Sequence, residues 1–388
     1  MTSSAGLPAP SPDAQAHSAL VTERIRELIS QAGGWLSFER FMETALYAPG
    51  LGYYSAGARK LGGEGDFITA PELSPLFGHT LARQVRDVIE AGFRDVLEIG
   101  AGTGALAATL LEELERLGAL PNQYLILEVS ADLRERSRDT IAARVPQLME
   151  RVAWLNRLPP EFSGVALGNE VLDAMPVHLV QTLAEDAGTA IEELGVGVSD
   201  GGFAWAAVPA GGEVLEAAQR LSLPAPYRTE LGLQASAFMR SLGEIMEGVA
   251  LFIDYGFPAR EYYHPDRSEG TLMCHYRHRA HDDPFFLPGL QDITSHVDFS
   301  AIAKAAADAG MEPAGFATQA QFLINCGITE LLSRVPAEDA KRYLPLANQA
   351  NRLLSPAEMG DLFKVIAFRR NCDLPLAGFS RGDRSHTL

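Results

Sequence analysis

Apolar residues along the chain follow two periods, and their alternation predicts an α/β fold. Short apolar runs predict strands that begin near residues 96, 125, 152, 165 and 249, with a last strand over residues 362–369. Apolar positions with helical spacing lie between them, at residues 105–117, 131–143 and 299–309. Strands and helices that alternate in this way form a parallel, doubly wound sheet. The pattern therefore predicts a sheet domain over residues 93–176 and 248–370.

Two further regions lack this alternation and predict additional parts. Helical spacing over residues 20–32, 35–45 and 75–91 predicts an N-terminal helical cap over residues 18–92. Two apolar runs and the turn Gly201-Gly202 predict a β-hairpin, which together with a helical stretch would form an inserted subdomain at residues 177–247. We expect residues 1–17 to form a disordered tail and residues 371–388 a loose one, because both are poor in apolar patterning.

Composition restricts the partners and the compartment. The 388 residues are 47% hydrophobic and carry a formal net charge of −18, which disfavours nucleic acid and anionic membranes as main partners. Three widely spaced cysteines without a Cys-x-x-Cys pair indicate a reducing compartment and predict no structural metal site. There is no apolar run of membrane-spanning length and no apolar signal core at the N-terminus. We therefore expect a cytoplasmic protein without membrane insertion.

The first indication of chemistry is the motif Glu98-x-Gly100-x-Gly102-x-Gly104, which joins a predicted strand to a predicted helix. Glycines at such a turn let a nucleotide-like ligand approach the bare backbone. Their spacing differs from the G-x-G-x-x-G of pyrophosphate-binding dinucleotide folds. It suits S-adenosylmethionine, which has no phosphate. The alternative is a tight strand–helix connection that binds no ligand.

A second acidic residue supports this interpretation. Glu128 ends the next strand, about 20 residues past the glycines, where a carboxylate can accept hydrogen bonds from both hydroxyls of a ribose. S-adenosylmethionine carries such a ribose, together with a sulfonium cation and an amino acid end that tolerate a carboxylate such as Glu98. We expect Glu98, the three glycines and Glu128 to bind this cofactor.

Five segments extend the pattern beyond the glycine motif itself. They are Tyr47-x-Pro49-x-x-Gly52-Tyr53-Tyr54, the sequence GDFITAPE at residues 65–72, the glycine motif, Asn169-Glu170-x-x-Asp173-Ala174-x-Pro176-Val177, and residues 292–299. In this order they resemble the MidA-like family of bacterial and mitochondrial S-adenosylmethionine-dependent methyltransferases. The resemblance spans roughly residues 20 to 370.

This resemblance implies both a fold and an activity. The fold is the Rossmann-like, doubly wound sheet of class I methyltransferases, carrying the helical cap and the inserted subdomain. The activity is methylation of an arginine on a protein partner. Mitochondrial members act on a subunit of respiratory complex I, so the resemblance names such a subunit as a candidate partner.

The end of the strand near residue 165 supplies candidate acceptor residues. Glu170 follows Asn169 at the edge where ligands bind in this sheet architecture. Carboxylates can grip a planar guanidinium, so we predict that Glu170 and Asp173 are catalytic and that Asn169 contacts the cofactor. His296, within the family-like segment, is the candidate base. The alternatives are a solvated strand end for Glu170, a helix cap or turn for Asp173, and a structural role for the histidine.

Residues before the sheet are predicted to complete the site. Thr69 and Pro71 are assigned to the cofactor, and Asp66 and Glu72 to the substrate arginine or the methionine end. The alternative is a helix entry, capped by Thr69 or Ser74. Tyr53 is predicted to stack on a cationic substrate, with the adjacent Tyr54 as the alternative, because two neighbouring residues of a strand cannot both face the same way.

Other functions stay open at this point. One is methylation of a small molecule, and another is a non-catalytic binding or assembly protein that retains the cofactor fold. The second predicts a lost glycine or carboxylate, whereas the motif is intact. A nicotinamide-dependent oxidoreductase would carry G-x-G-x-x-G, which is absent here. No residue pattern predicts the oligomeric state.

Overall fold

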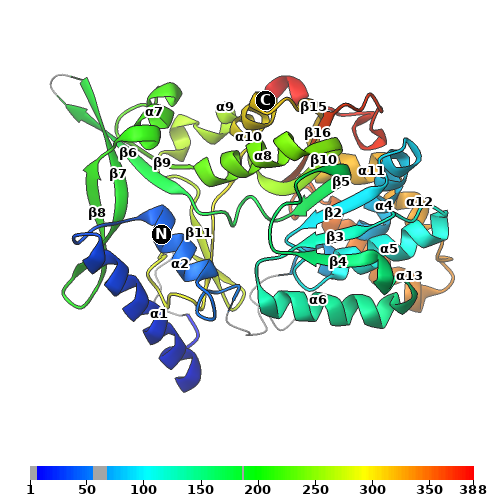
Figure 1. The fold of residues 1–388 in the computed structure, drawn as a ribbon, viewed down its shortest axis with the longest axis horizontal. Helices are drawn as coiled ribbons and strands as arrows, with labels where there is room; N and C mark the ends of the chain where they lie inside the picture. The colour runs from blue at the N-terminus through cyan, green and yellow to red at the C-terminus, as the bar shows by residue number, and fades with distance from the viewer. Residues whose placement is uncertain (1–6, 56–67, 186–187) are drawn as a thin grey trace. The chain divides into compact units, whose positions relative to one another are not determined.

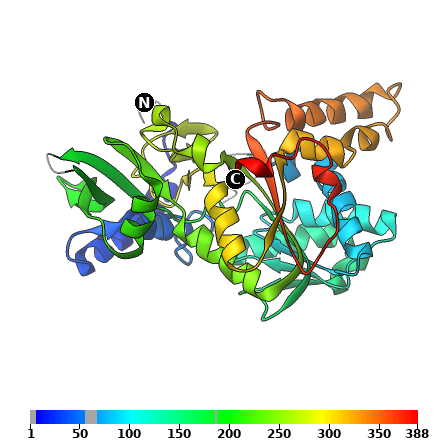
Figure 2. The same ribbon diagram turned by 90° about the horizontal axis from the view of Figure 1, so that it is seen from above.

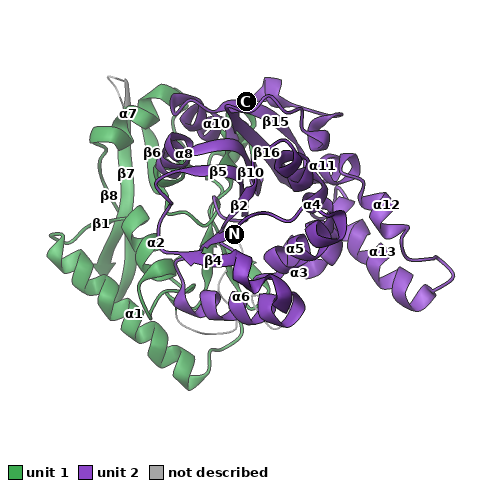
Figure 3. Cartoon of the chain, turned by 45° about the vertical axis from the view of Figure 1, so that its right-hand side comes forward, with its two compact units in different colours: residues 1–67, 173–236, 257–298 green, residues 68–172, 237–256, 299–388 purple. Residues whose placement is uncertain are grey.

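The computed structural model describes residues 7–55, 68–185 and 188–388 (Figure 1). The chain divides into two compact units (Figure 3). Unit 1 contains residues 1–67, 173–236 and 257–298, and unit 2 contains residues 68–172, 237–256 and 299–388. Among the described residues, no helix combines the length and the apolar character that crossing a bilayer requires.

Unit 2 is built on a mixed sheet with the strand order β15-β16-β10-β5-β2-β3-β4. The central strands β10, β5, β2, β3 and β4 are parallel, whereas β16 and β15 run antiparallel at one side. The predicted α/β fold with a parallel core is therefore confirmed. The strands are β2 (Asp95–Ile99), β3 (Tyr124–Leu127), β4 (Val152–Leu155), β5 (Phe162–Asn169), β10 (Met246–Phe257), β15 (Glu312–Thr318) and β16 (Phe363–Arg370).

Helices with one apolar face complete unit 2. In α5 (Ala105–Leu117), the side chains of Leu106, Leu110 and Leu114 recur at intervals of four and are buried in the core. The helix α4 (Pro75–Glu90) packs on α5, and the C-terminal helices pack in turn on α4 (Figure 2). The other helices are α3 (Ala70–Leu73), α6 (Ala131–Arg144), α8 (Leu233–Ile245), α10 (Phe299–Asp308), α11 (Gln319–Asn325), α12 (Ile328–Leu332) and α13 (Ala340–Leu354).

Unit 1 is formed around an antiparallel sheet with the order β1-β7-β6-β9, and β8 pairs with β7. The predicted hairpin is confirmed: β7 and β8 pair to Ser199 and Gly202, and the two residues between them both have positive φ. The elements are α1 (Pro12–Gln31), β1 (Leu36–Ser37), α2 (Phe38–Tyr47), β6 (His178–Glu185), β7 (Gly188–Ser199), β8 (Gly202–Pro209), α7 (Gly212–Leu221), β9 (Tyr227–Leu231), α9 (Ala259–Tyr262) and β14 (Val297–Asp298). A smaller sheet has the order β12 (Arg279–His281), β11 (Met273–Tyr276), β13 (Asp292–Thr294).

The units differ from the predicted domain boundaries because of one long-range strand pairing. Leu36 of β1 pairs with Val196 of β7, so the start of the predicted cap belongs with the predicted insertion in unit 1. The end of the predicted cap, residues 68–92, belongs to unit 2. Neither grouping is visible in local sequence patterns, because sheet pairing joins segments far apart in the chain.

The predictions for the two chain ends were also wrong in part. The helix α1 begins at Pro12, inside the predicted disordered tail, and the Ser11 hydroxyl accepts a hydrogen bond from the Ala14 amide at 3.2 Å. At the other end, Leu376 and Phe379 are buried, and the Phe379 ring lies 5.3 Å from that of Phe322. Apolar side chains spaced singly in a polar segment gave no periodic signal, yet they anchor this segment on α11.

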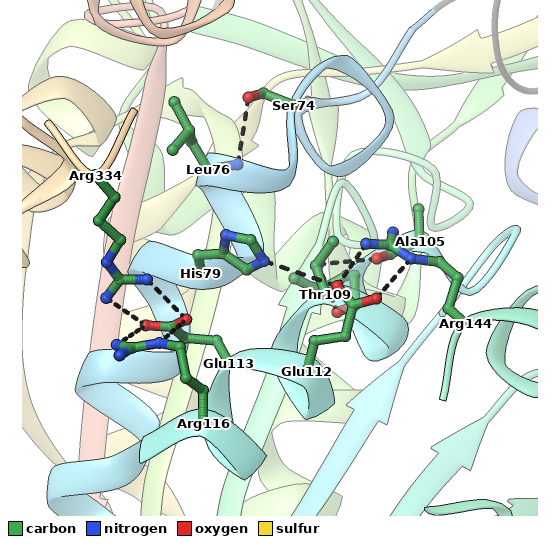
Figure 4. Close-up of polar contacts among 11 residues, drawn as sticks. Ser74, Leu76, His79, Ala105, Thr109, Glu112, Glu113, Arg116, Arg144 and Arg334 are labelled. Carbon is green, nitrogen blue, oxygen red and sulfur yellow. Dashed lines mark hydrogen bonds and ion pairs between the residues drawn. The ribbon is translucent and has the colours of Figure 1, made fainter. Parts of the chain in front are cut away.

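Charged side chains join α5 to Arg334, which follows α12 (Figure 4). The carboxylate of Glu113 is 2% exposed and accepts hydrogen bonds from Arg116 and Arg334, both at distances near 2.8 Å. Burial raises the pKa of Glu113, but these hydrogen bonds and charges outweigh burial and lower the pKa to about 2. The neighbouring Glu112 pairs with Arg144 at a more exposed position.

We expect Glu113→Gln to lower the free energy of unfolding by about 2 kcal/mol at pH 7. The substitution removes a buried negative charge from between two arginines, and the effect stays moderate because water partly screens the arginine charges. The folded pKa of Glu113 lies below its ordinary value of 4.5. Its contribution is therefore present above pH 4.5 and is lost as the pH falls towards 2. Urea unfolding of both proteins at several pH values measures this difference.

The matched control is Glu112→Gln, which removes an exposed ion pair from the adjacent position and should cost less than about 1 kcal/mol. Equal effects of the two substitutions, or a Glu113→Gln effect that does not shrink in acid, would contradict this account of the network.

Candidate functional site

The turn between β2 and α5 has a backbone that favours glycine at three positions. Gly100, Gly102 and Gly104 have φ values of 67°, 54° and 82°, in the left-handed region. A Cβ at Gly104 would lie 2.8 Å from the Cα of Ser137 on α6, and one at Gly100 would lie 3.0 Å from the Val171 side chain. The glycines therefore let α5, α6 and the end of β5 approach closely around the turn.

Glu128 lies directly beside this turn, just past the end of β3. Its side chain is 5% exposed and accepts a hydrogen bond from the Ser130 amide at 2.9 Å. Burial raises the pKa of Glu128, while hydrogen bonds from the backbone N–H groups of Ser130 and Gly102 act in the opposite direction. The structure thus brings together the glycine motif and the carboxylate of Glu128, which the sequence predicted at the ends of two consecutive strands.

The residue after Glu128 was not anticipated from the sequence. Val129 is 70% exposed, although it is apolar and follows a buried strand. The exposed side chain of Val129 could pack against an aromatic ring of a ligand, while the adjacent carboxylate of Glu128 could accept hydrogen bonds from hydroxyl groups of the same ligand. The signal was present in the sequence, as an apolar residue between Glu128 and the Ser130 that caps α6.

Glu98 has a different environment from Glu128. It is 2% exposed, and the Tyr124 hydroxyl donates a hydrogen bond to its Oε2 at 2.6 Å. Burial raises the pKa of Glu98 to about 7, against the opposing effect of the Tyr124 hydrogen bond and with a further increase from the charge of Glu128. Its predicted place near the cationic end of the cofactor stays a prediction.

The carboxyl end of β5 carries a strained acidic residue. Glu170 has φ of 52°, which is uncommon for a residue with a side chain. Its Oε1 accepts a hydrogen bond from the Asn169 side-chain amide at 3.1 Å. The Oδ1 of Asn169 is buried and has no hydrogen-bond partner among the described residues. An unpaired buried acceptor of this kind fits a donor from a ligand.

Asp254, on the adjacent strand β10, holds the chain that follows Glu170. Its side chain is 1% exposed, and one oxygen accepts hydrogen bonds from the amides of Val171 and Leu172 at 3.2 and 2.9 Å. Our sequence reasoning missed Asp254. The acidic residue at the end of an apolar run was a signal for it, but its partners depend on the pairing of β10 with β5.

The residues present fit S-adenosylmethionine at this edge of unit 2. The left-handed glycine turn leaves backbone uncovered, Glu128 supplies a buried carboxylate beside it, and Asn169 supplies an unpaired acceptor. These groups match a ligand that carries a ribose diol and an ammonium group. Their individual roles stay predictions.

The stretch before α4 is also tied to the glycine turn. Thr69 precedes α3 without capping it through its side chain, whereas Ser74 caps α4 by accepting a hydrogen bond from the Leu76 amide. Glu72 accepts a hydrogen bond from the Thr103 hydroxyl at 3.1 Å, within the glycine motif. Glu72 thus contacts the cofactor turn, and its predicted substrate role and the cofactor roles of Thr69 and Pro71 stay predictions. Asp66 lies outside the described residues.

The remaining candidates belong to unit 1. Asp173 is 4% exposed, and its carbonyl accepts a hydrogen bond from the Ser295 amide at 3.0 Å. The His296 ring stacks on Phe257 with centroids 5.3 Å apart. Tyr53 is 1% exposed and packs edge-on against Tyr54 in the core of unit 1, so the structure argues against the predicted stacking of Tyr53 on a substrate. The catalytic roles of Asp173 and His296 stay predictions.

Comparisons with solved structures identify close relatives of the whole chain. A Burkholderia thailandensis protein crystallised with S-adenosyl-homocysteine is 51% identical, with a TM-score of 0.94 and coverage of 99% of this chain and 100% of that one. A native crystal structure from the same organism is also 51% identical, with a TM-score of 0.92 and the same coverage.

Comparisons of sequence agree with this. The family profile of an S-adenosyl-L-methionine-dependent methyltransferase matches residues 77–317. The mitochondrial protein arginine methyltransferase NDUFAF7 of Bos taurus is 28% identical over 384 residues, which are 89% of this chain and 83% of that protein. The Mus musculus protein of the same name is 29% identical over 392 residues, with coverage of 91% and 85%.

We expect Gly104→Ala to lower the free energy of unfolding by about 3 kcal/mol, of which about 1 kcal/mol is left-handed strain and the rest the clash of Cβ with the backbone of Ser137. Gly118→Ala is the matched control at the other end of α5. Gly118 has φ of 71°, and a Cβ there would meet nothing within 4 Å. It should therefore cost only the strain, about 1 kcal/mol. Urea unfolding measures both values, and equal losses would show that the turn tolerates a side chain.

Proposed function

Because the chain belongs to the family of S-adenosyl-L-methionine-dependent methyltransferases, we propose that it transfers a methyl group to an arginine side chain of a protein. The resemblance to the MidA-like family, the class I fold and the cofactor are confirmed by the family profile and by the structural relatives. The arginine acceptor is our inference. It is supported by the curated relatives, which are named protein arginine methyltransferases.

The observation that carries the proposal is the arrangement of Asn169 and Glu170 at the end of β5. Glu170 holds a carboxylate on a left-handed backbone at the strand edge, next to a buried and unpaired acceptor on Asn169. A guanidinium is planar, permanently charged and delocalised, so it is a weak nucleophile. A carboxylate that accepts hydrogen bonds from its N–H groups can fix its plane and draw the positive charge onto the nitrogens it contacts, which leaves more electron density on the attacking nitrogen.

In this proposal different residues of unit 2 bind the cofactor and orient the substrate. Glu128 would accept hydrogen bonds from the ribose hydroxyls, Val129 would cover the adenine, and the Oδ1 of Asn169 would accept from the ammonium group. Bound S-adenosylmethionine supplies an electrophilic methyl group on a sulfonium. Glu170 would orient the guanidinium for in-line attack. The arginine nitrogen would form a bond to the methyl carbon as the carbon–sulfur bond breaks, S-adenosyl-homocysteine would leave as a neutral thioether, and the proton of the nitrogen would pass to solvent water.

The partner and compartment belong to this proposal as well. A basic, arginine-bearing protein suits the net charge of −18, and a respiratory complex I subunit is the partner that the family resemblance implies. A cytoplasmic location stays a prediction from composition, while the named curated relatives are mitochondrial.

We expect Glu128→Ala to weaken binding of S-adenosyl-homocysteine by about 10-fold to 150-fold, the equivalent of about 1.5–3 kcal/mol for hydrogen bonds to a charged group. Glu135→Ala is the control, because Glu135 is exposed on the adjacent helix α6. Isothermal titration calorimetry on the full chain measures both. Affinity that is unchanged in Glu128→Ala would remove Glu128 from the ribose site.

We expect Glu170→Gln to retain affinity for S-adenosyl-homocysteine and to lower methyl transfer by about 100-fold or more, since a neutral amide cannot concentrate the guanidinium charge. Glu161→Gln is the control, because Glu161 is exposed and directly precedes the opposite end of β5. The assay combines purified enzyme, S-adenosylmethionine labelled on the methyl group and protein extract from cells that lack the gene. Acid hydrolysis then identifies the labelled amino acid.

Label in methylarginine, lost in Glu170→Gln, would support the proposal. Label in another amino acid would overturn the arginine acceptor, and label confined to small molecules would favour a small-molecule methyltransferase. Full activity of Glu170→Gln would remove Glu170 from the mechanism.

A further inference from the structure

The arginine Arg134 of α6 joins the ends of two neighbouring strands. Its Nε donates a hydrogen bond to the carbonyl of Glu128 at 2.6 Å, and one terminal nitrogen donates to the carbonyl of Leu155. These carbonyls lie at the carboxyl ends of β3 and β4. One guanidinium therefore contacts main-chain groups on both strands at the edge where the cofactor is proposed to bind.

The pairing of β3 with β4 ends beside these carbonyls. The parallel register of β3 and β4 runs from Tyr124 with Val152 to Leu127 with Leu155, and β4 is the outermost strand of this side. Beyond this point nothing in the ladder fixes the distance between the strands. The rigid fork of a guanidinium can satisfy two carbonyls at once, which the single ammonium of a lysine cannot do with the same geometry.

This contact closes a ring of hydrogen bonds around Glu128. The Ser130 amide donates to the Glu128 side chain, the Ser130 hydroxyl caps α6, and Arg134 from the first turns of that helix donates back to the Glu128 carbonyl. The backbone of Glu128 is thus held by Arg134 while its carboxylate is held by main-chain amides.

We infer that Arg134 is a positioning residue for the cofactor, which holds the ends of β3 and β4 at the spacing that aims the Glu128 carboxylate at the ribose. This inference rests on the proposed role of Glu128. It assigns no contact between Arg134 and the cofactor itself.

The charge of Arg134 acts on the same carboxylate. Burial raises the pKa of Glu128, and the positive charge of Arg134 is among the influences that lower it again. Without that charge, Glu128 would take up a proton at a higher pH than it does now. The pH dependence of cofactor affinity therefore reports on Arg134 separately from any loss of stability.

The same helix offers a matched control. Arg136 pairs with Asp132 one turn earlier at 2.9 Å, whereas the guanidinium of Arg134 contacts the carbonyls of Glu128 and Leu155. Arg134→Met and Arg136→Met remove the same charge and a similar volume from α6. Arg134→Lys keeps the charge but not the fork.

The experiment is calorimetric titration of the full chain and these variants with S-adenosyl-homocysteine between pH 5 and about pH 8, with urea unfolding to compare stability. Arg134→Met should bind about 10-fold more weakly at pH 7, with the acid loss of affinity moved to higher pH. Arg134→Lys should lose affinity by a few-fold with the acid loss unmoved. Arg136→Met should bind within about twofold of the wild type.

Several outcomes would overturn the inference. One is an Arg134→Met variant that binds like the wild type while Glu128→Ala binds weakly, which would leave the ribose role of Glu128 intact. Another is a weakened Arg134→Met whose pH profile is unmoved. If the methionine variant does not fold, Arg134→Lys decides, because wild-type affinity there would show that the fork is not needed. A wild type without saturable binding would overturn the proposed cofactor site and this inference with it.

Discussion

The left-handed turn between β2 and α5 is the constraint on which the rest of unit 2 depends. A side chain at Gly104 would meet the backbone of Ser137, so the glycine decides how closely α5 and α6 can pack. The same turn presents the Gly102 amide to Glu128. Packing of the helices and the geometry of the candidate site are therefore coupled. A shift of α6 would move both the contact at Gly104 and the end of β3 that carries Glu128.

The acidic residues Glu98 and Glu128, near the ends of neighbouring strands, are stabilised in different ways. Glu98 is held by the Tyr124 hydroxyl inside the sheet, and burial raises its pKa to about 7. Glu128 instead accepts hydrogen bonds from main-chain amides beside the turn, and these partly offset the increase in its pKa that burial causes. A carboxyl group that can take up a proton can stay buried without a charged partner. A carboxylate supported by amides suits acceptance of hydroxyl hydrogens from a ligand.

Local signals in the sequence predicted much of the fold and the candidate site. The glycine spacing, the acidic residue at the end of β3 and the turn between β7 and β8 each reflect backbone geometry within a few residues, and the structure has these turns and strand ends. Non-local features could not be predicted in this way. The pairing of Leu36 with Val196 joins the two segments of unit 1, and the partners of Asp254 depend on which strands are neighbours. The burial of Tyr53 likewise depends on packing.

The backbone strain at Glu170 can be compared with the hydrogen bonds to Asp254 that stabilise the following residues. A residue with a side chain in the left-handed region costs of order 1–2 kcal/mol. The two amides that follow it donate to Asp254, and hydrogen bonds to a charged acceptor contribute about 1.5–3 kcal/mol each. The offset comes from the neighbouring strand and needs no ligand, so the backbone of Glu170 is held in this conformation by the protein alone. Preorganisation of this kind helps a group that must stabilise charge in a transition state. A binding module without chemistry would have no need of it, which favours an enzyme over an assembly protein that has only kept the fold.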